Sequence, residues 1–187
     1  MSEQRPTFLF YDSKPFIVDE YKKVLSDGIK KSLFVVEDVR KIPLKYKIDA
    51  IVSPANSFGL MDGGIDLILR KMFPLIENKV KNAIAEKRCA VTNGGAPYLP
   101  VGNTITIKTD DPKCPLLLCV PTMYLPSCVV GTNNVYNAFY SIMREYGDND
   151  IVIACCGLAT YTGMMEPKES AKQILKAYND YYINAPK

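Results

Sequence analysis

The chain has 187 residues, of which 48% are hydrophobic, so it is long enough for one domain and too apolar for a disordered chain. Its net charge is +3, and no basic run exceeds Lys30-Lys31, which argues against nucleic-acid binding through a basic patch. The sequence has no apolar stretch of membrane-spanning length, and the start, Met1 to Arg5, does not resemble a signal peptide. We expect one domain over residues 1–187 that is monomeric, has no membrane partner, and is cytoplasmic or nuclear rather than secreted.

The sequence contains no histidine, which excludes Ser-His-Asp and Cys-His nucleophilic schemes and His-based metal sites. Any catalysis must therefore use carboxylates, amides, hydroxyls, lysine, a bound water or groups of the substrate. None of the six cysteines stands in a CxxC pair, and Cys119, Cys155 and Cys156 lie in or beside apolar runs. We expect reduced thiols, no metal site and no cofactor.

Apolar strand-like segments alternate with amphipathic helical segments along the chain. In chain order, the predicted elements are strand Thr7–Tyr11, helix Phe16–Leu25, strand Ser32–Val36, strand Ala50–Val52, a helix from Ile65 through Met72, helix Leu75–Lys87, a turn at Asn93-Gly94-Gly95, strand Thr104–Lys108, strand Leu116–Val120, a helix capped by Asn133 or Asn134 and running through Met143, strand Ile151–Cys156 and a helix from about Pro167 to Tyr182. This alternation predicts a mostly parallel sheet with helices on both faces. Ligands bind such sheets beyond the carboxyl ends of the strands.

The stretch from Asp49 to Asp66 reads as a strand, a Gly-rich loop and a helix start. Glycines let backbone amides approach a ligand, and a helix N-terminus offers free N–H groups and a positive dipole end. This order therefore suits a phosphate or a phosphorylated ribose. A pair such as Gly63-Gly64 more often forms only a tight turn, but Asn56, Asp62 and Asp66 crowd the same turn and favour a site.

The same stretch resembles the macro domain family, which carries an N-x-A-N loop after a strand and G-G-G-[VI]-D at the next helix start. Ser53-Pro54-Ala55-Asn56 and Asp62-Gly63-Gly64-Ile65-Asp66 match these motifs, with Ser53 in place of the first Asn. The match is similar to a branch of ADP-ribose-1''-phosphate phosphatase-like proteins with the motif SPANSFGxMDGGID. The resemblance, which extends from about Ser32 to Tyr178, implies a three-layer α/β/α sandwich with a mixed, mostly parallel central sheet that binds ADP-ribose or an ADP-ribosylated substrate.

Two other segments carry the resemblance. Asp38-Val39 stands where the family has the Asp and Ile of G-D-I-T, which contact the adenine base, although Glu37 replaces the usual Gly. Taken alone, Asp38 is a solvated loop carboxylate. The segment from Gly157 to Gly163 matches a loop that wraps the diphosphate, with Ala159 and Tyr161 in place of glycines. A tyrosine there either strains the loop, fills the pocket, or stacks on the ribose or base.

By this resemblance, Asn56 would hydrogen-bond the distal ribose, and Asp66 would orient or activate a water or hold a ribose hydroxyl. The alternative for Asp66 is a helix N-terminal carboxylate that stabilises the dipole. The implied ADP-ribose contacts are Asp38, Val39, Ala55, Asn56, Gly63, Gly64, Ile65, Gly157, Leu158, Ala159, Thr160, Tyr161, Thr162 and Gly163.

Three functional hypotheses follow. The first is a hydrolase, either an ADP-ribose 1''-phosphate phosphatase or a mono-ADP-ribosyl hydrolase. The second is a non-catalytic reader of ADP-ribose, which Ser53 and Tyr161 favour because both depart from the family pattern. The third is a degenerate domain used as an interaction surface. A Rossmann dinucleotide site and a P-loop are excluded, since neither G-x-G-x-x-G after the first strand nor GxxxxGK[ST] occurs.

Overall fold

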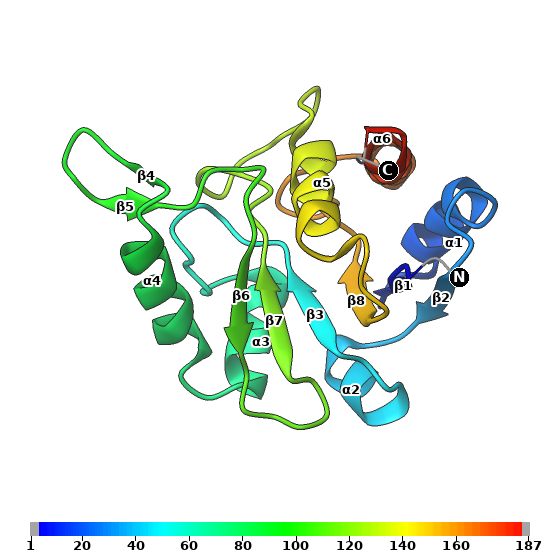
Figure 1. The fold of residues 1–187 in the computed structure, drawn as a ribbon, viewed down its shortest axis with the longest axis horizontal. Helices are drawn as coiled ribbons and strands as arrows, with labels where there is room; N and C mark the ends of the chain where they lie inside the picture. Colours follow the sequence, from blue (N-terminus) through cyan, green and yellow to red (C-terminus); the bar gives the residue numbers. More distant parts are fainter. Residues whose placement is uncertain (1–3, 185–187) are drawn as a thin grey trace.

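A computed structural model describes residues 4–184, in which six strands form one central sheet (Figure 1). Met1 to Glu3, part of the segment predicted not to be a signal peptide, lies outside the described residues. The strand order is β2-β1-β8-β3-β7-β6. The bounds are β1 Thr7–Asp12, β2 Ser32–Val36, β3 Ala50–Ser53, β6 Ile105–Lys108, β7 Leu116–Cys119 and β8 Val152–Cys156.

All neighbouring strands of this sheet run parallel except β6, which pairs antiparallel with β7. The register places Tyr11 of β1 opposite Cys156 of β8, and Ser53 of β3 opposite Cys119 of β7. The carboxyl ends of these four strands therefore lie at one edge of the sheet. The predicted mixed, mostly parallel sheet is confirmed.

Helices cover both faces of the sheet, as predicted (Figure 1). On one face, α1 (Pro15–Leu25), α5 (Asn134–Tyr146) and α6 (Pro167–Asn184) pack on one another. Ring contacts fix this face, since Phe10 lies 5.9 Å from Tyr21 of α1 and Phe8 lies 4.9 Å from Phe139 of α5, centroid to centroid. On the other face lie η1 (Val39–Lys41), α2 (Ile42–Lys45), α3 (Gly64–Met72) and α4 (Ile76–Lys87), with α3 behind the strands in Figure 1. Burying both faces explains why the central strands are almost entirely apolar.

The structure adds short elements that the periodicity did not predict. The η1 and α2 turns follow β2, where the sequence suggested only a junction. Strands β4 (Ala90–Val91) and β5 (Pro97–Tyr98) form a small hairpin, and the predicted turn at Asn93-Gly94-Gly95 connects them. Elements of two to four residues contain too few side chains to show a period, so pattern analysis misses them.

One predicted cap differs in its chemistry. Asn133 occupies the N-cap position of α5, but its side chain makes no capping hydrogen bond. Thr132 Oγ1 accepts from the Asn134 N–H instead (3.3 Å). The Asn134 side chain donates to the carbonyl of Thr122 (2.9 Å), which ties the start of α5 to the segment after β7.

Within residues 4–184, none of the helices combines the length and apolar character needed to span a membrane. The cysteines are all free; Cys89 and Cys128 are exposed, and the other four are buried. The described residues also contain no group of three or more acidic or cysteine side chains placed to hold a metal ion.

Candidate ligand-binding and catalytic site

A cavity of about 480 Å³ opens at the carboxyl ends of the parallel strands. Its walls come from the carboxyl-terminal ends of five strands and the segments that follow them, which are residues 11–14, 37–39, 54–68, 122–126 and 156–163. These segments are far apart in the sequence, and the strand order brings them to one edge. This is the place where a doubly covered parallel sheet offers a ligand site.

The N-terminus of α3 forms one wall of the cavity, through Gly63, Gly64 and Ile65. Gly64 has a φ of +54°, a left-handed conformation that glycine adopts without strain. Within the described residues no side chain caps α3, and the Leu67 N–H is the one that bonds back to Gly63 (3.1 Å). The N–H groups of the first turn therefore remain available to an anion at the positive end of the helix dipole.

Asp66 lies in that first turn and is only 8% exposed. The Ser53 hydroxyl donates to Asp66 Oδ1 (2.7 Å), whereas no described residue bonds Oδ2. Burial raises the pKa of Asp66, the Ser53 hydrogen bond lowers it, and the Asp62 carboxylate raises it, so that together they bring it to about 6. A carboxylate with this pKa exchanges protons near neutral pH, as a general base or acid requires.

Asn56 lines the cavity, but its amide is largely used within its own loop. Nδ2 donates to the carbonyl of Leu60 (2.8 Å), and Oδ1 accepts from the N–H groups of Phe58 (3.1 Å) and Leu60 (3.2 Å). Both acceptor positions of the amide oxygen are therefore filled, and one Nδ2 hydrogen is left for a ligand. Asn56 shapes the loop and has one donor to offer.

At another part of the cavity lies Asp12, the last residue of β1. Its side chain is buried, and Oδ1 accepts from the N–H of Lys14 (3.0 Å) and from the Tyr161 hydroxyl (2.6 Å). No described residue bonds Oδ2. A Cβ at position 157 would lie only 3.0 Å from Asp12 Oδ2, so glycine at this position leaves room for the Asp12 carboxylate.

Tyr161 links two segments of the cavity wall, the loop after β8 and the end of β1. It stands on the loop after β8, is 53% exposed, and reaches across to Asp12 at the end of β1. Partial burial and the Asp12 carboxylate raise the pKa of Tyr161 to about 12, so the hydroxyl keeps its proton and donates. The positive φ values of this loop are those of Ala159 (+58°), where the family pattern has Gly, and Met164 (+55°), and not that of Tyr161.

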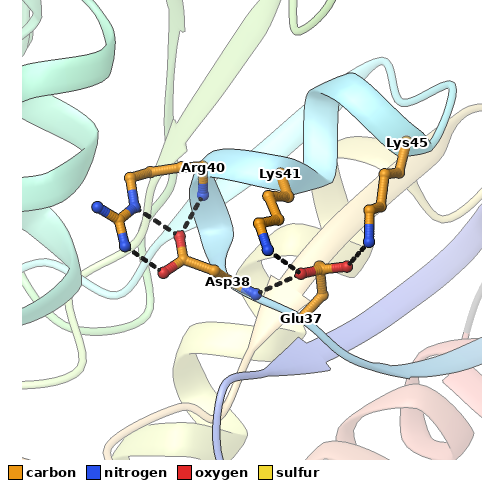
Figure 2. A network of polar contacts seen from close by, with 5 residues as sticks. All are labelled: Glu37, Asp38, Arg40, Lys41 and Lys45. Carbon is orange, nitrogen blue, oxygen red and sulfur yellow. Dashed lines mark hydrogen bonds and ion pairs between the residues drawn. The ribbon is translucent and has the colours of Figure 1, made fainter.

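Asp38 also lines the cavity, but a local cation holds its carboxylate (Figure 2). Arg40 donates from its backbone N and Nε to Oδ1 and from Nη2 to Oδ2, at 2.9, 2.8 and 2.6 Å. The guanidinium lowers the pKa of Asp38 to about 2. Lys41 and Lys45 pair with Glu37 in the same network. The carboxylates of this segment are thus neutralised locally, and Asp38 also serves as the N-cap of η1.

No protein-family model matches the chain, and no curated protein matches it. Solved structures match its fold. The macrodomain of Mycobacterium tuberculosis DarG has a TM-score of 0.58 at 15% identity, and the match covers 74% of this chain and 86% of that one. The macrodomain of Thermus aquaticus DarG gives 0.56 at 16% identity, with the same coverage.

Thermosipho africanus DarTG in complex with ADP-ribose gives a TM-score of 0.61 at 14% identity, over 90% of this chain and 49% of that one. The chain has the macrodomain fold. At these identities the likeness concerns the fold, and the chemistry of the cavity must be argued from this chain's own side chains.

The macrodomain fold brings almost all of the sequence-predicted site residues into one cavity. Asp38, Val39, Asn56, Gly63, Gly64, Ile65, Asp66, Gly157 and the residues Ala159, Thr160, Tyr161, Thr162 and Gly163 line it. Ala55 and Leu158 do not line the cavity and are buried behind it.

Sequence reasoning missed several lining residues. These are Tyr11, Asp12, Ser13, Lys14, Glu37, Pro54, Leu60, Ile68, Thr122, Met123, Pro126 and Cys156. For Asp12 a signal existed, because a carboxylate directly after a buried strand lies at the ligand-binding edge of a parallel sheet. In the macrodomain fold of this chain that strand is β1, which neighbours β8.

Proposed function

We propose that this chain binds ADP-ribose in the cavity and hydrolyses a bond at C1'' of the distal ribose. Its substrate is either ADP-ribose 1''-phosphate or ADP-ribose attached to a side chain. The observation that carries this proposal is the Asp66 carboxylate, which is buried, lines the cavity and keeps one oxygen free beside the uncapped N-terminus of α3. The macrodomain fold and the ADP-ribose complex of the Thermosipho africanus DarTG protein support the choice of ligand.

The cavity offers different groups to the parts of this ligand. The α3 N-terminus and the loop after β8 supply backbone N–H groups for the diphosphate. Two carboxylates, Asp12 and Asp38, compete for the amino group of the base. We assign this contact to Asp12, because its Oδ2 is free of protein partners whereas Arg40 occupies both oxygens of Asp38.

Asp66 and Asn56 are assigned to the distal ribose. In the hydrolytic step, the oxygen of a water molecule forms the new bond, the bond to the leaving phosphate or side chain breaks, and the Asp66 carboxylate accepts the water's proton. The proton is then passed to the leaving group, so water and substrate yield ADP-ribose and the free acceptor. A pKa of about 6 keeps Asp66 largely ionised at neutral pH and able to accept that proton.

Calorimetric titration with ADP-ribose and phosphate release from ADP-ribose 1''-phosphate test the proposal together. We expect micromolar binding, and phosphate release that Asp66→Asn abolishes while binding stays within about threefold. Asp27→Asn, an exposed carboxylate that does not line the cavity, is the matched control. Absence of heat with the parent protein and with Tyr161→Gly overturns the proposal, whereas binding by Tyr161→Gly alone means that this side chain closes the site.

A non-catalytic reader is the second candidate, and the contacts of Asn56 favour it. Most of the hydrogen-bonding capacity of this amide is spent on Phe58 and Leu60, which leaves little to orient a ribose for reaction. The two candidates separate clearly. A reader binds ADP-ribose with the same affinity but releases neither phosphate nor ADP-ribose from any substrate offered.

A further inference from the structure

The carboxylate of Asp66 is held by a side chain that is anchored in the central sheet. Ser53 is the last residue of β3 and is 1% exposed. It lies opposite Cys119 in the register, and its carbonyl accepts from the Val120 N–H (3.0 Å). The hydroxyl that reaches Asp66 Oδ1 (2.7 Å) therefore starts from a fixed point of the backbone.

None of the ion pairs among the described residues involves Asp66. The titratable groups that face it are the Asp62 carboxylate from its own loop, the Cys119 thiol from β7 and the Cys156 thiol from β8. Both thiols keep their protons because burial raises their pKa values. Apart from the dipole of α3, Ser53 is thus the group that favours the ionised form.

The hydrogen bond also decides which way the carboxylate points. With Oδ1 bound to Ser53, the plane of the carboxylate is fixed. The Asp66 side chain lines the cavity, and its Oδ2 has no partner among the described residues. Without the hydroxyl, either oxygen could turn toward the sheet. Charge-assisted hydrogen bonds of this length are strong enough to hold a side chain in one orientation.

We propose that Ser53 is the positioning residue of this site, which holds Oδ1 of Asp66 and thereby presents Oδ2, ionised, to the ligand. This inference rests on the proposed function for the role of Asp66. The interaction itself does not, because it exists in the free protein. Serine at this position, which departs from the Asn of the family motif, then has a use of its own as the donor to this carboxylate.

Two variants and one control test the inference. Ser53→Ala removes the donor, and Ser53→Thr keeps a hydroxyl at a strand position that favours a β-branched residue. Ser141→Ala is the control, because it also removes a buried hydroxyl, one that bonds Thr104 Oγ1 (2.7 Å) and does not line the cavity. The first readout is the pKa of Asp66 from carboxyl ¹³C chemical shifts, assigned with Asp66→Asn.

We expect Ser53→Ala to raise the pKa of Asp66 by about 1 to 2 pH units above that of the parent, because the lost hydrogen bond favoured the charged form. Both Ser53→Thr, which keeps a hydroxyl, and Ser141→Ala should leave the pKa of Asp66 at the parent value. In turn, kcat/KM for phosphate release by Ser53→Ala falls about tenfold at pH 5.5 and less than about threefold at pH 8.5. A purely structural loss lowers the rate equally at both pH values.

The outcomes distinguish the inference from the proposed function. An unchanged pKa of Asp66 in Ser53→Ala, in a protein that still binds ADP-ribose, overturns the inference and leaves the function standing. A shifted pKa in a protein that neither binds nor hydrolyses ADP-ribose overturns the function and supports Ser53 as the residue that orders Asp66. If Ser53→Ala fails to fold, Ser53→Cys gives the same test with Ser53→Thr as its control, since cysteine is a weak donor of similar size.

Discussion

Two carboxylates of the cavity, Asp66 and Asp12, have the same arrangement of hydrogen bonds, but their hydroxyl donors come from different distances along the chain. Each is buried, and each has Oδ1 bound by a hydroxyl from another element, Ser53 in one case and Tyr161 in the other. In both, Oδ2 has no partner among the described residues. Ser53 and Asp66 are 13 residues apart, whereas Tyr161 and Asp12 are 149 residues apart.

The donors of the two pairs also differ in exposure and in the element that carries them. Ser53 is fixed in the sheet and almost fully buried, whereas Tyr161 is half exposed on a loop. We infer that the Ser53–Asp66 pair is a rigid part of the site and that the Tyr161–Asp12 pair adjusts to the ligand. A rigid group suits the reacting bond, where small misplacements are costly, and an adjustable one suits recognition of the base.

The largest expected difference between the two carboxylates is in catalysis. Asp66→Asn should lower kcat for phosphate release by about 10²- to 10⁴-fold, the usual worth of a general base. Asp12→Asn should change kcat by less than about fivefold and act on KM instead. Steady-state kinetics on ADP-ribose 1''-phosphate measure both, and a loss of kcat that is larger in Asp12→Asn would reverse the assignment.

Asp66 should also affect how the free energy of unfolding depends on pH, and the sign of this effect follows from its pKa. Burial raises that pKa from 3.8 to about 6, so the folded state favours the protonated acid. The free energy of unfolding that this preference contributes is fully present only below the unfolded pKa of 3.8 and is lost as pH rises through 6. The neutral variant Asp66→Asn should therefore gain about 2 kcal/mol in free energy of unfolding, relative to the parent, between pH 4 and pH 8.

Urea denaturation at both pH values measures this difference, and other titrating groups cancel because they are common to the two proteins. Ser141→Ala, which changes no charge, provides the reference for a buried substitution. A difference between Asp66→Asn and the parent that stays the same at pH 4 and pH 8 would contradict a buried Asp66 with a raised pKa.

Binding separates Asp12 from Asp38, another carboxylate that lines the cavity. Asp12→Asn should weaken ADP-ribose binding about 10- to 100-fold, because a buried acceptor for a ligand donor is replaced by an amide. Asp38→Asn should weaken it less than about threefold, since Arg40 already occupies that carboxylate. Calorimetry on both variants decides the matter, and the opposite order would return the base contact to Asp38.

The distance in sequence between the residues that determine a feature explains which parts of the fold and site could be predicted from the sequence. The individual strands, the long helices and the Asp66 turn each depend on residues within about 20 positions, so periodicity and glycine placement indicate them, and the alternation of strands and helices indicates a mostly parallel sheet. The short η1, α2 and β4–β5 elements give no periodic signal. Asp38 was assigned to the base from its position before the motif, and the sequence could not show that Arg40 holds it.

Asp12 was missed for a topological reason. It follows the first strand, and its importance depends on β1 lying next to β8, a neighbour that is about 140 residues away. Tyr161 was recognised as a departure from the family pattern, yet its partner could not be named. Its hydroxyl meets Asp12 only when the two strands are placed side by side.

The smallest expected effect concerns that hydroxyl. Tyr161→Phe removes the hydrogen bond to Asp12 Oδ1 and keeps the ring, so binding of ADP-ribose should weaken about three- to tenfold. Tyr161→Phe in the Asp12→Asn background should add little, because the hydroxyl acts through the carboxylate, and a double-mutant cycle by calorimetry measures this coupling. Additive losses would instead mean that Tyr161 contacts the ligand with its own hydroxyl, and the two pairs would then no longer share one design.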